Sequence, residues 1–483
     1  MTDAAPESPP SSTASGRSRR TKLVCTIGPA TIRRVPELIE AGMDVARLNF
    51  SHGTPASRAA AAGAIRRGAD ATGRSVAVLA DLSGPKIRLG ELESGSVTLQ
   101  PGRPFELRPL GGGPGTARGA GVSYRRLAAD VRPGDRILLA DGAAELRVTD
   151  VGAAVATEVV RGGVVRSRQG VSIPSERLSV PALTPADRRD VPRALGLGAD
   201  FVAQSFVRHA SDVQALRDLL GPDGPPIVAK IETRSAIDDF DQILEVVDAV
   251  MIARGDMGVE LPYEEVPIVQ KQLIRRALDR GVPSIVATQM LESMIASPRP
   301  TRAEASDVAN AVFDGADAIM LSGETAVGSH PILAAAAAAR IIRLCEERGA
   351  AHLAPGAATP VAGDAGALAY AAVALAAAHG DIAGIACYTR SGRTARMLAA
   401  LRPRVPIFAF SPDPVVVGRL AIVHGVTARS CVPPADTAAR LGLMAWLLGE
   451  SGDLAPGSAV ALVASTAAAG TGPNLLEVYR LPG

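Results

Sequence analysis

The sequence is poor in lysine, cysteine and net charge. Its 51 basic residues include only four lysines, Lys22, Lys86, Lys230 and Lys271, so arginine supplies the other 47. A formal charge of +2 argues against a nucleic-acid-binding protein, whose domains are usually far more basic. The four cysteines lie far apart with no CxxC pair, which indicates neither a disulfide framework nor a zinc site and fits a reducing cytoplasm.

Long apolar runs are also missing. No run of about 18 uncharged apolar residues occurs, and the alanine-rich stretch 331–340 is too short to span a bilayer. Residues 1–20 are rich in proline, serine and alanine without an apolar core, so we expect a disordered tail and no signal peptide. With 47% hydrophobic composition over 483 residues, the chain can bury the cores of about two to four domains.

Between residues 21 and 345 a short apolar run and a helix-like segment alternate. The apolar runs are KLVCTIG, DVARLNF, VAVLADL, DFVAQSFV, PIVAKIET, AVMIARGD, SIVATQML and AIMLSGET. Continuous apolar strands suit a parallel sheet that is buried on both faces. Eight such units predict a parallel (β/α)8 TIM barrel over 21–86 and 181–348, with a doubly wound open sheet as the alternative.

Two segments depart from this alternation. Residues 87–180 hold short strands separated by glycine and proline, which predicts an inserted all-β domain. The helical pattern resumes at TPADRRDVPRALGLG, where we expect Thr184 as the N-cap and Pro185 in the first turn. After a Gly/Pro/Ala-rich stretch we expect a C-terminal α/β domain over 360–483, with strands in IAGIACYT, VPIFAFS and AVALVAST.

The strand ends of the predicted barrel are strongly polar, and the chemistry of such barrels sits at the C-terminal ends of the strands. The polar residues at these ends are Arg47, Asn49, Ser51, Asp81, Lys86, Arg88, Lys230, Glu232, Arg254, Gly255, Asp256, Thr288, Gln289, Ser322 and Glu324. A ring of charges at one barrel mouth is hard to assign to stability alone.

Glu232 and Asp256 end neighbouring strands, which run about 4.8 Å apart. Two carboxylates without histidine or cysteine suit Mg²⁺ or Mn²⁺. The alternative is an ion pair of Glu232 with Lys230. A lysine in IVAKIET is costly to bury unpaired, which favours a functional lysine, whereas Lys271 on an amphipathic helix is an ordinary surface lysine. We place Lys230 and Glu232 on opposite sides of an alternating strand, so we expect a local twist if they share one site.

Seven segments occur in an order that resembles the successive signatures of pyruvate kinases. They are TKLVCTIGPAT, GMDVARLNFSHG, DLSGPKIR, AKIET, MIARGDMGVELP, ATQMLESM and RAEASDVANAVFDGADAIMLSGETAVGSHP. The resemblance covers nearly the whole chain after the tail and is weakest in the inserted domain. It implies a cytoplasmic homotetramer that transfers the phosphoryl group of phosphoenolpyruvate to ADP, giving pyruvate and ATP.

The resemblance also implies roles for single residues. Glu232 and Asp256 hold the divalent ion. Arg47 and Lys230 flank the phosphoryl group. The amides around Gly255 and Asp256, with Thr288, take the substrate carboxylate, and Thr288 lies near the enolate face that receives the proton. The positions near the nucleotide are His52, Arg88 and Asn49. No GxxxxGK[ST] segment exists, so a P-loop does not hold the nucleotide.

The inserted domain is then expected to close as a lid that excludes water. Family members often carry a lysine pair where this chain has Arg168 and Gln169, which puts the lid's contact with ADP in doubt.

A monovalent cation is required by many members of the family, held at positions matching Asn49, Ser51, Asp81 and the carbonyl of Leu82. Those members tend to have glutamate where this chain has Lys86, so we expect the ammonium of Lys86 to replace K⁺. The alternative is a lysine paired with a nearby carboxylate.

The segment CYTRSGRTARMLAALRP between a predicted strand and helix suggests an anion site, because helix N-termini and hydroxyls bind phosphate. In pyruvate kinases the similar loop receives the phosphate of a sugar-phosphate activator. The residues concerned are Thr389, Ser391, Gly392, Arg393 and Thr394. The alternative is simple N-capping by Ser391 or Thr394.

Two other functions are compatible with the sequence. A metal-dependent 2-keto-acid aldolase or lyase also needs a glutamate and an aspartate on neighbouring strands, but not a lid or a C-terminal domain. A catalytically silent metabolite sensor has no need of an intact ring of charged groups.

Overall fold

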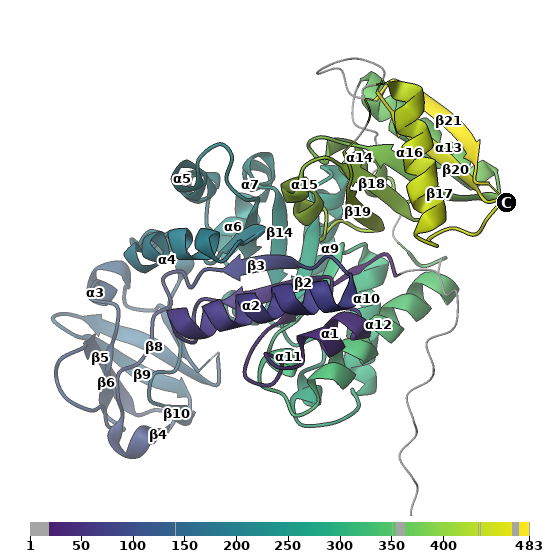
Figure 1. Cartoon of the computed structure of the whole chain (residues 1–483). Coiled ribbons are helices and arrows are strands. Elements are labelled where there is room, and N and C mark those ends of the chain that lie inside the picture. Colours follow the sequence, from purple (N-terminus) through teal and green to yellow (C-terminus); the bar gives the residue numbers. More distant parts are fainter. Residues whose placement is uncertain are drawn as a thin grey trace, which may run out of the picture.

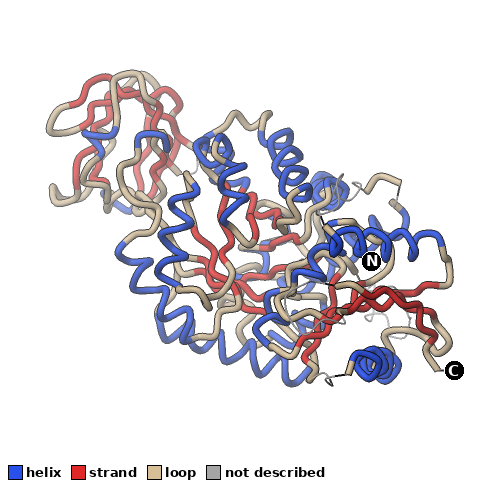
Figure 2. Tube along the Cα trace, turned by 90° about the horizontal axis from the view of Figure 1, so that it is seen from above, coloured by secondary structure: helices blue, strands red, loops and turns tan. Residues whose placement is uncertain are grey.

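Eight parallel strands close into a barrel at the centre of the computed structural model, which describes residues 19–140, 142–349, 351–353, 363–432, 434, 436–465 and 473–482 (Figure 2). The strand order is β1-β16-β15-β14-β13-β12-β3-β2. Each strand lies within one of the predicted apolar runs, which confirms the (β/α)8 barrel and makes the open sheet wrong. The bounds are β1 Lys22–Thr26, β2 Val45–Asn49, β3 Ala77–Asp81, β12 Phe201–Gln204, β13 Ile227–Ile231, β14 Ala249–Ala253, β15 Ser284–Ala287 and β16 Ala318–Leu321.

Three of the long barrel helices, α2, α4 and α10, begin with a capping box. The helix that begins at Pro185 has a capping box in which Thr184 and Asp187 bond reciprocally, as predicted for Thr184 and Pro185. No helix in the described ranges combines the length and apolar character needed to cross a membrane. The helices are α1 Val35–Ala41, α2 Pro55–Thr72, α4 Pro185–Gly196, α5 Ala210–Leu220, α6 Arg234–Asp238, α7 Phe240–Val246, α8 Arg254–Glu260, α9 Val266–Asp279, α10 Arg302–Asp314, α11 Gly323–Ala326 and α12 Pro331–Arg348, with a 3-10 turn η3 Glu292–Ile295.

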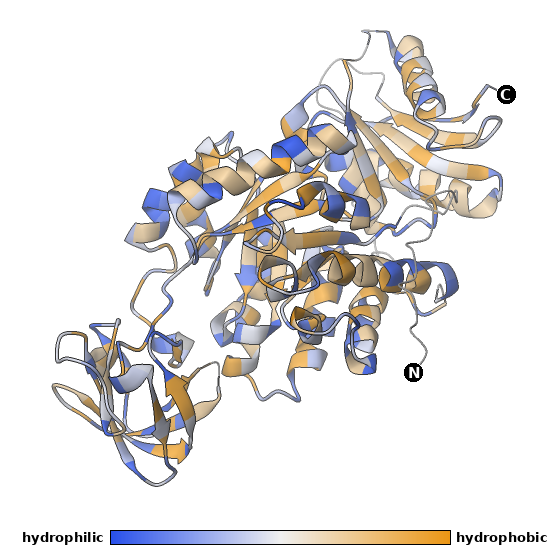
Figure 3. Cartoon of the chain, turned by 60° about the horizontal axis from the view of Figure 1, so that its bottom comes forward, coloured by the Kyte–Doolittle hydropathy of each residue, from blue (hydrophilic) through white to orange (hydrophobic). Residues whose placement is uncertain are grey.

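An all-β domain with its own apolar core is inserted between β3 and α4. It contains a six-stranded sheet in the order β11-β7-β8-β9-β5-β6 and the pair β10-β4. Figure 3 shows this domain standing away from the barrel and joined to it by two chain segments. Its elements are η1 Glu93–Gly95, β4 Ser96–Leu99, β5 Pro104–Pro109, β6 Gly119–Val122, α3 Leu127–Asp130, β7 Arg136–Leu139, β8 Ala144–Val151, β9 Val155–Arg161, β10 Gly163–Arg166, β11 Val171–Ser172 and η2 Ser175–Arg177.

The predicted N-terminal tail falls outside the described residues, except for its last two positions. Arg19 forms an ion pair with Asp44 at 2.6 Å, and the backbone N–H of Arg20 donates to Glu346 at 2.8 Å. These two arginines therefore anchor the start of β1 against the barrel.

The C-terminal domain is built on a five-stranded sheet in the order β19-β18-β17-β20-β21, with β21 antiparallel to β20 (Figure 1). β17, β18 and β20 lie in the three predicted segments, whereas β19 and β21 are edge strands that the sequence did not predict. Its elements are α13 Asp364–Ala378, β17 Ile382–Tyr388, α14 Arg393–Ala400, β18 Ile407–Ser411, α15 Pro414–Arg419, β19 Val426–Ser430, α16 Thr437–Glu450, β20 Ala459–Ala464 and β21 Leu475–Arg480.

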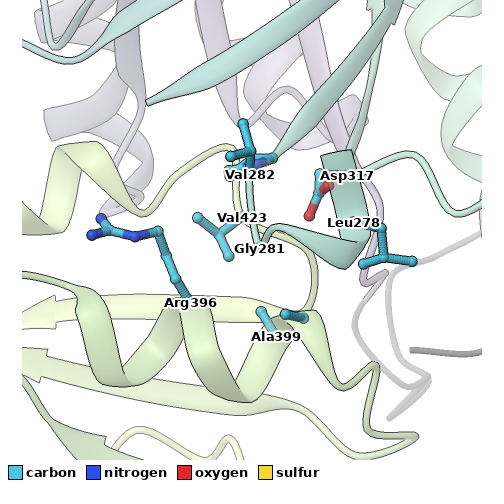
Figure 4. A pocket seen from close by; sticks show the side chains of 9 residues that line it. Leu278, Gly281, Val282, Asp317, Arg396, Ala399 and Val423 are labelled. Carbon is cyan, nitrogen blue, oxygen red and sulfur yellow. The ribbon is translucent and has the colours of Figure 1, made fainter. Parts of the chain in front are cut away.

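Polar contacts join the C-terminal domain to the end of the barrel opposite its mouth. Lys22 Nζ, at the start of β1, donates to the carbonyl of Val426 at 2.7 Å. Asp317, just before β16, accepts from Arg402 Nη1 at 3.0 Å. A pocket between α14 and the base of the barrel is lined by Arg396, Val282 and Val423 among others (Figure 4). The mouth is therefore left to the inserted domain.

We predict that His424 makes this junction sensitive to acid. Burial, followed by the charges of Arg402, Arg20 and Lys22, holds the pKa of its imidazole well below 6.5. The unfolded chain takes up this proton and the folded chain does not. Stability from this group is therefore present above about pH 6.5 and decreases by about 1.4 kcal/mol per pH unit below it. In thermal melts between about pH 7.5 and pH 5.5, His424→Gln should lose stability less steeply than the wild type. The exposed control His379→Gln should follow the wild type; identical slopes for all three proteins would contradict the prediction.

Candidate active site

The ammonium of Lys230 lies at the C-terminal end of β13 and contacts three side chains. Lys230 Nζ donates to Ser205 Oγ at 2.7 Å and lies 3.5 Å from Glu232 Oε2 and 3.6 Å from Asp81 Oδ1. Burial alone lowers the pKa of Lys230, but the carboxylates of Asp81, Glu232 and Asp256 outweigh that effect and raise it. The lysine is therefore charged, and its contacts lie at the ends of strands β3, β12 and β13.

The expected local twist between Lys230 and Glu232 is wrong. The two residues are separated by Ile231, so both follow the same side of an alternating strand, and their side chains meet without any twist. The predicted alternative, an ion pair between them, is present at 3.5 Å. It does not use up the carboxylate, because Glu232 Oε2 is buried and accepts no hydrogen bond in the described structure.

Arg47 extends the charged cluster from β2. Its Nη2 lies 2.6 Å from Asp81 Oδ2, and its Nη1 donates to Thr26 Oγ1 at 3.0 Å. Asp81 is 1% exposed. Burial raises the pKa of Asp81, but Lys230 and Arg47 together hold it below its usual range. Arg47 and Lys230 are thus fixed on either side of one ionised carboxylate.

The two carboxylate oxygens of Glu232 have different partners. Its Oε1 accepts the N–H of Phe206 at 2.7 Å, whereas Oε2 has no hydrogen bond. Burial raises the pKa of Glu232 to about 7, with Lys230 opposing and Asp256 adding to the shift. Asp256 lies in the first turn of α8, directly after β14. No set of three or more His, Cys, Asp or Glu side chains in the described ranges is arranged for a metal ion.

Thr288 and Gln289 follow β15 with left-handed backbone angles, φ 73° and φ 55°. Such angles are strained in non-glycine residues and cluster at functional sites. Arg254 Nη2 donates to the carbonyl of Thr288 at 2.7 Å, and the N–H of Gly255 donates to Thr288 Oγ1 at 2.7 Å. The predicted carboxylate-binding residues Gly255 and Thr288 are therefore in contact, and the amide of Gly255 is occupied by the hydroxyl.

The predicted monovalent-cation positions converge at the ends of β2 and β3. Asn49 and Asp81 are register partners, and Asn49 Oδ1 accepts the N–H of Ser51 at 3.0 Å. The carbonyl of Leu82 accepts a hydrogen bond from Ser205 Oγ at 2.6 Å. Ser205 thus links this region to Lys230.

The charges of three basic side chains act on His52, which was predicted to lie near the nucleotide. Burial, followed by the charges of Arg88, Lys86 and Arg47, lowers the pKa of His52. Lys86 is exposed and forms no ion pair with any described residue, so the predicted alternative of a carboxylate partner is not observed. A positive potential therefore reaches His52 from the segment that leads into the inserted domain.

The segment of the inserted domain whose contact with ADP was in doubt is engaged internally. Arg168 pairs with Glu91 at 2.5 Å, and Gln169 Oε1 accepts the N–H of Arg166 at 2.6 Å. Arg88 Nη1 donates to the carbonyl of Arg168 at 3.2 Å.

The C-terminal loop at 389–394 joins β17 to α14. The N-cap of α14 is Gly392, which has a left-handed φ of 76°, and no side chain forms a capping hydrogen bond there. The predicted alternative of N-capping by Ser391 or Thr394 is therefore wrong. Thr389 and Thr394 are buried, whereas Ser391 and Arg393 are exposed.

Other members of the predicted polar ring have local structural contacts. Arg254 pairs with Asp307 at 2.7 Å. Glu324 accepts the N–H groups of Leu291 and Ser322 at 3.1 and 2.7 Å.

Sequence reasoning missed Ser205 and Phe206. Both directly follow β12, in the run DFVAQSFV, and Phe206 has a left-handed φ of 55° that turns its N–H toward Glu232. The rule applied to the other strands, that the residues after each strand end face the mouth, also finds Ser205. The backbone angle of Phe206 has no signal in the sequence.

Comparison with known proteins agrees with this geometry. Residues 18–335 match the family described as pyruvate kinase, barrel domain, and residues 366–479 match pyruvate kinase, alpha/beta domain. A pyruvate kinase of Mycobacterium tuberculosis is 44% identical over 96% of this chain and 99% of its own length. A pyruvate kinase of Geobacillus stearothermophilus is 41% identical over 95% of this chain and 80% of its own. The crystal structure of a pyruvate kinase from Cryptosporidium parvum superposes with a TM-score of 0.87 at 34% identity, covering 96% of both chains. Both domains match the family, and the relatives are similar over nearly the whole chain. This chain therefore belongs to the pyruvate kinase family of phosphotransferases.

Proposed function

We propose that the described cluster transfers the phosphoryl group of phosphoenolpyruvate to ADP, with Lys230 and Arg47 as the cations that flank it. The observation that carries this proposal is the arrangement of both cations around the single carboxylate of Asp81, at 3.6 and 2.6 Å. Phosphoryl transfer needs positioning and charge neutralisation more than covalent chemistry, and fixed cations supply both.

Thr288, Gly255 and Asp256 form the remainder of the substrate site in this proposal. The substrate carboxylate binds at the first turn of α8, where it replaces the hydroxyl of Thr288 on the amide of Gly255. The freed hydroxyl then orients a water that protonates the enolate, because a threonine hydroxyl alone is a poor acid. The base of ADP lies outside this cluster, with its phosphates near His52, Arg88 and Asn49.

Glu232 and Asp256 fit a divalent ion, Mg²⁺ or Mn²⁺. The buried Oε2 of Glu232 accepts no hydrogen bond, although Lys230 Nζ lies 3.5 Å away, and the pKa of that carboxyl is raised by burial, so a further cation beside this oxygen would stabilise its charge. When bound, such an ion supplies positive charge to substrate oxygens.

We also propose a cytoplasmic location and a homotetramer. Large exposed aromatic side chains, including Tyr370 at 55% and Trp446 at 58% exposed, support the homotetramer.

Asp256→Asn tests this reaction and its metal site together. The change removes a formal charge and a good oxygen ligand, so the Mg²⁺ concentration for half-activation should rise about tenfold or more. Pyruvate formation from phosphoenolpyruvate plus ADP, followed in a coupled assay, is the readout. Asp238→Asn removes an exposed carboxylate from α6 and serves as the control. Unchanged Mg²⁺ dependence would show that Asp256 is structural, and a wild type that forms no pyruvate would favour the lyase or sensor.

We further propose that the enzyme does not require K⁺, because Lys86 supplies the positive charge. The unpaired, exposed ammonium and its effect on the pKa of His52 support this role. A lysine is a compact point charge on a flexible stem and can act as a single ion, whereas the planar fork of arginine cannot.

In tetramethylammonium buffer free of K⁺ and NH₄⁺, we expect full turnover by the wild type. Lys86→Glu should lower activity and make it respond to K⁺, because the bound ion then restores the lost charge. Arg67→Glu reverses an exposed charge on α2 and should leave the enzyme unresponsive. Strong activation of the wild type by K⁺ would overturn this proposal.

The loop of Thr389, Ser391, Gly392, Arg393 and Thr394 is proposed to bind a phosphorylated effector. Since no side chain caps α14, the amides of its first turn are available to an anion, and Arg393 is exposed beside them.

We expect a sugar phosphate to lower the half-saturating concentration of phosphoenolpyruvate for the wild type. Arg393→Ala should lose most of this shift because it removes a charged hydrogen-bond donor to the phosphate. Arg404→Ala, which removes an exposed arginine beyond the other end of α14, is the matched control. A panel of sugar phosphates that leaves the wild-type curve unchanged, or an Arg393→Ala enzyme that shifts equally, would contradict the effector site.

A further inference from the structure

The chain that returns from the inserted domain to the barrel is bound from the barrel side by one arginine. Arg208, in the loop after β12, donates from Nη1 to the carbonyl of Leu178 and from Nη2 to the carbonyl of Val180, the latter at 2.7 Å. Its side chain is 13% exposed. The two carbonyls are two residues apart, and the planar fork of arginine binds both.

The residue between these carbonyls is bound from the opposite side by the inserted domain. Asp130, at the end of α3, accepts the N–H of Ser179 at 2.9 Å and its hydroxyl at 2.7 Å. The hydroxyl of Tyr124 donates to the same carboxylate. Residues 178–180 are therefore held alternately by the barrel and by the inserted domain. We call this segment the return linker.

Arg208 is also part of the turn that shapes the active site. Two residues before it, the N–H of Phe206 holds Glu232 Oε1, and Ser205 binds Lys230. Asp212 accepts the N–H of Arg208 at 2.9 Å and so fixes the start of the side chain. The return linker is therefore bound by the same loop, 205–208, whose Ser205 and Phe206 bind Lys230 and Glu232.

We propose that Arg208 is a positioning residue: together with Asp130 it fixes the return linker as the pivot on which the inserted domain closes over the mouth to hold ADP. This inference rests on the proposed role of the inserted domain as a lid. In the proposed function, phosphoenolpyruvate binds within the barrel, whereas the phosphates of ADP bind near Arg88, where the chain enters the inserted domain. Loss of the pivot therefore affects ADP more than phosphoenolpyruvate.

The test compares KM values for the two substrates in full-length variants. Arg208→Gln should raise KM for ADP at least about fivefold and change KM for phosphoenolpyruvate less than about twofold. Arg208→Lys keeps the charge but loses the planar guanidinium group. Its KM for ADP should therefore lie between those of the wild type and Arg208→Gln. Arg217→Gln is the matched control, because Arg217 on the neighbouring helix α5 also donates to a backbone carbonyl, that of Val246, away from the linker.

A double-variant cycle shows whether both sides act through the linker. Asp130→Asn should raise KM for ADP in the same direction, and the double variant should be no worse than the more affected single variant, because coupled residues are not additive. Multiplying effects, or an Arg208→Gln enzyme with wild-type KM for ADP and an unchanged melting temperature, would overturn the inference. If Arg208→Gln does not fold, Asp130→Asn carries the test from the lid side.

Arg88→Gln separates this inference from the proposed function. A raised KM for ADP in Arg88→Gln but not in Arg208→Gln leaves the nucleotide site standing and overturns the pivot. The reverse result supports the pivot and overturns the proposed nucleotide contact of Arg88.

Discussion

A single buried ammonium group organises the barrel mouth. Removing a charged group from water costs several kcal/mol unless it is paired, and Lys230 meets this cost with Glu232, Asp81 and Ser205. Each of these partners also makes a second contact. Asp81 also holds Arg47, Glu232 also accepts the N–H of Phe206, and Ser205 also binds the carbonyl of Leu82. One charge therefore ties β3 to β12 and β13, although the inserted domain separates β3 from them in the sequence.

The two buried carboxylates of the cluster, Asp81 and Glu232, are balanced by different numbers of cations. Asp81 is balanced by two cations and keeps a lowered pKa, whereas Glu232 shares one lysine and has its pKa raised by burial to about 7. The two carboxylates of one small site therefore differ in how fully their charge is balanced. Arg47 and Lys230 are both held by protein side chains, Arg47 by Asp81 and Thr26, and Lys230 by Asp81, Glu232 and Ser205.

The two ends of the barrel have different partners. The C-terminal domain is joined by Lys22, Arg402 and Asp317 to the ends of the strands opposite the mouth. The inserted domain is joined near the mouth, where the return linker runs past Arg208. The rigid barrel lies between them, so any effect of the C-terminal loop on the reaction has to cross its strands.

Much of the architecture could be predicted from local pattern. Eight continuous apolar runs predicted the eight barrel strands because a parallel sheet buried on both faces leaves no polar alternation. Thr184 and Pro185 predicted the start of α4, because capping depends on residues within one turn. The edge strands β19 and β21 escaped prediction because they are only partly buried and carry no continuous apolar run.

The sequence by itself determined which side chains follow the strands, and hence that Arg47, Asp81, Lys230, Glu232 and Asp256 gather at one end of the barrel. Only the tertiary structure decided how they share partners. Ser205 bridges Lys230 and Leu82 because β12 lies between β3 and β13 in the closed barrel. Phe206 reaches Glu232 through a left-handed backbone angle that its residue type does not favour. Hydrogen bonds between residues distant in sequence depend on strand order and backbone angles, and neither quantity is encoded in a local pattern of residue types.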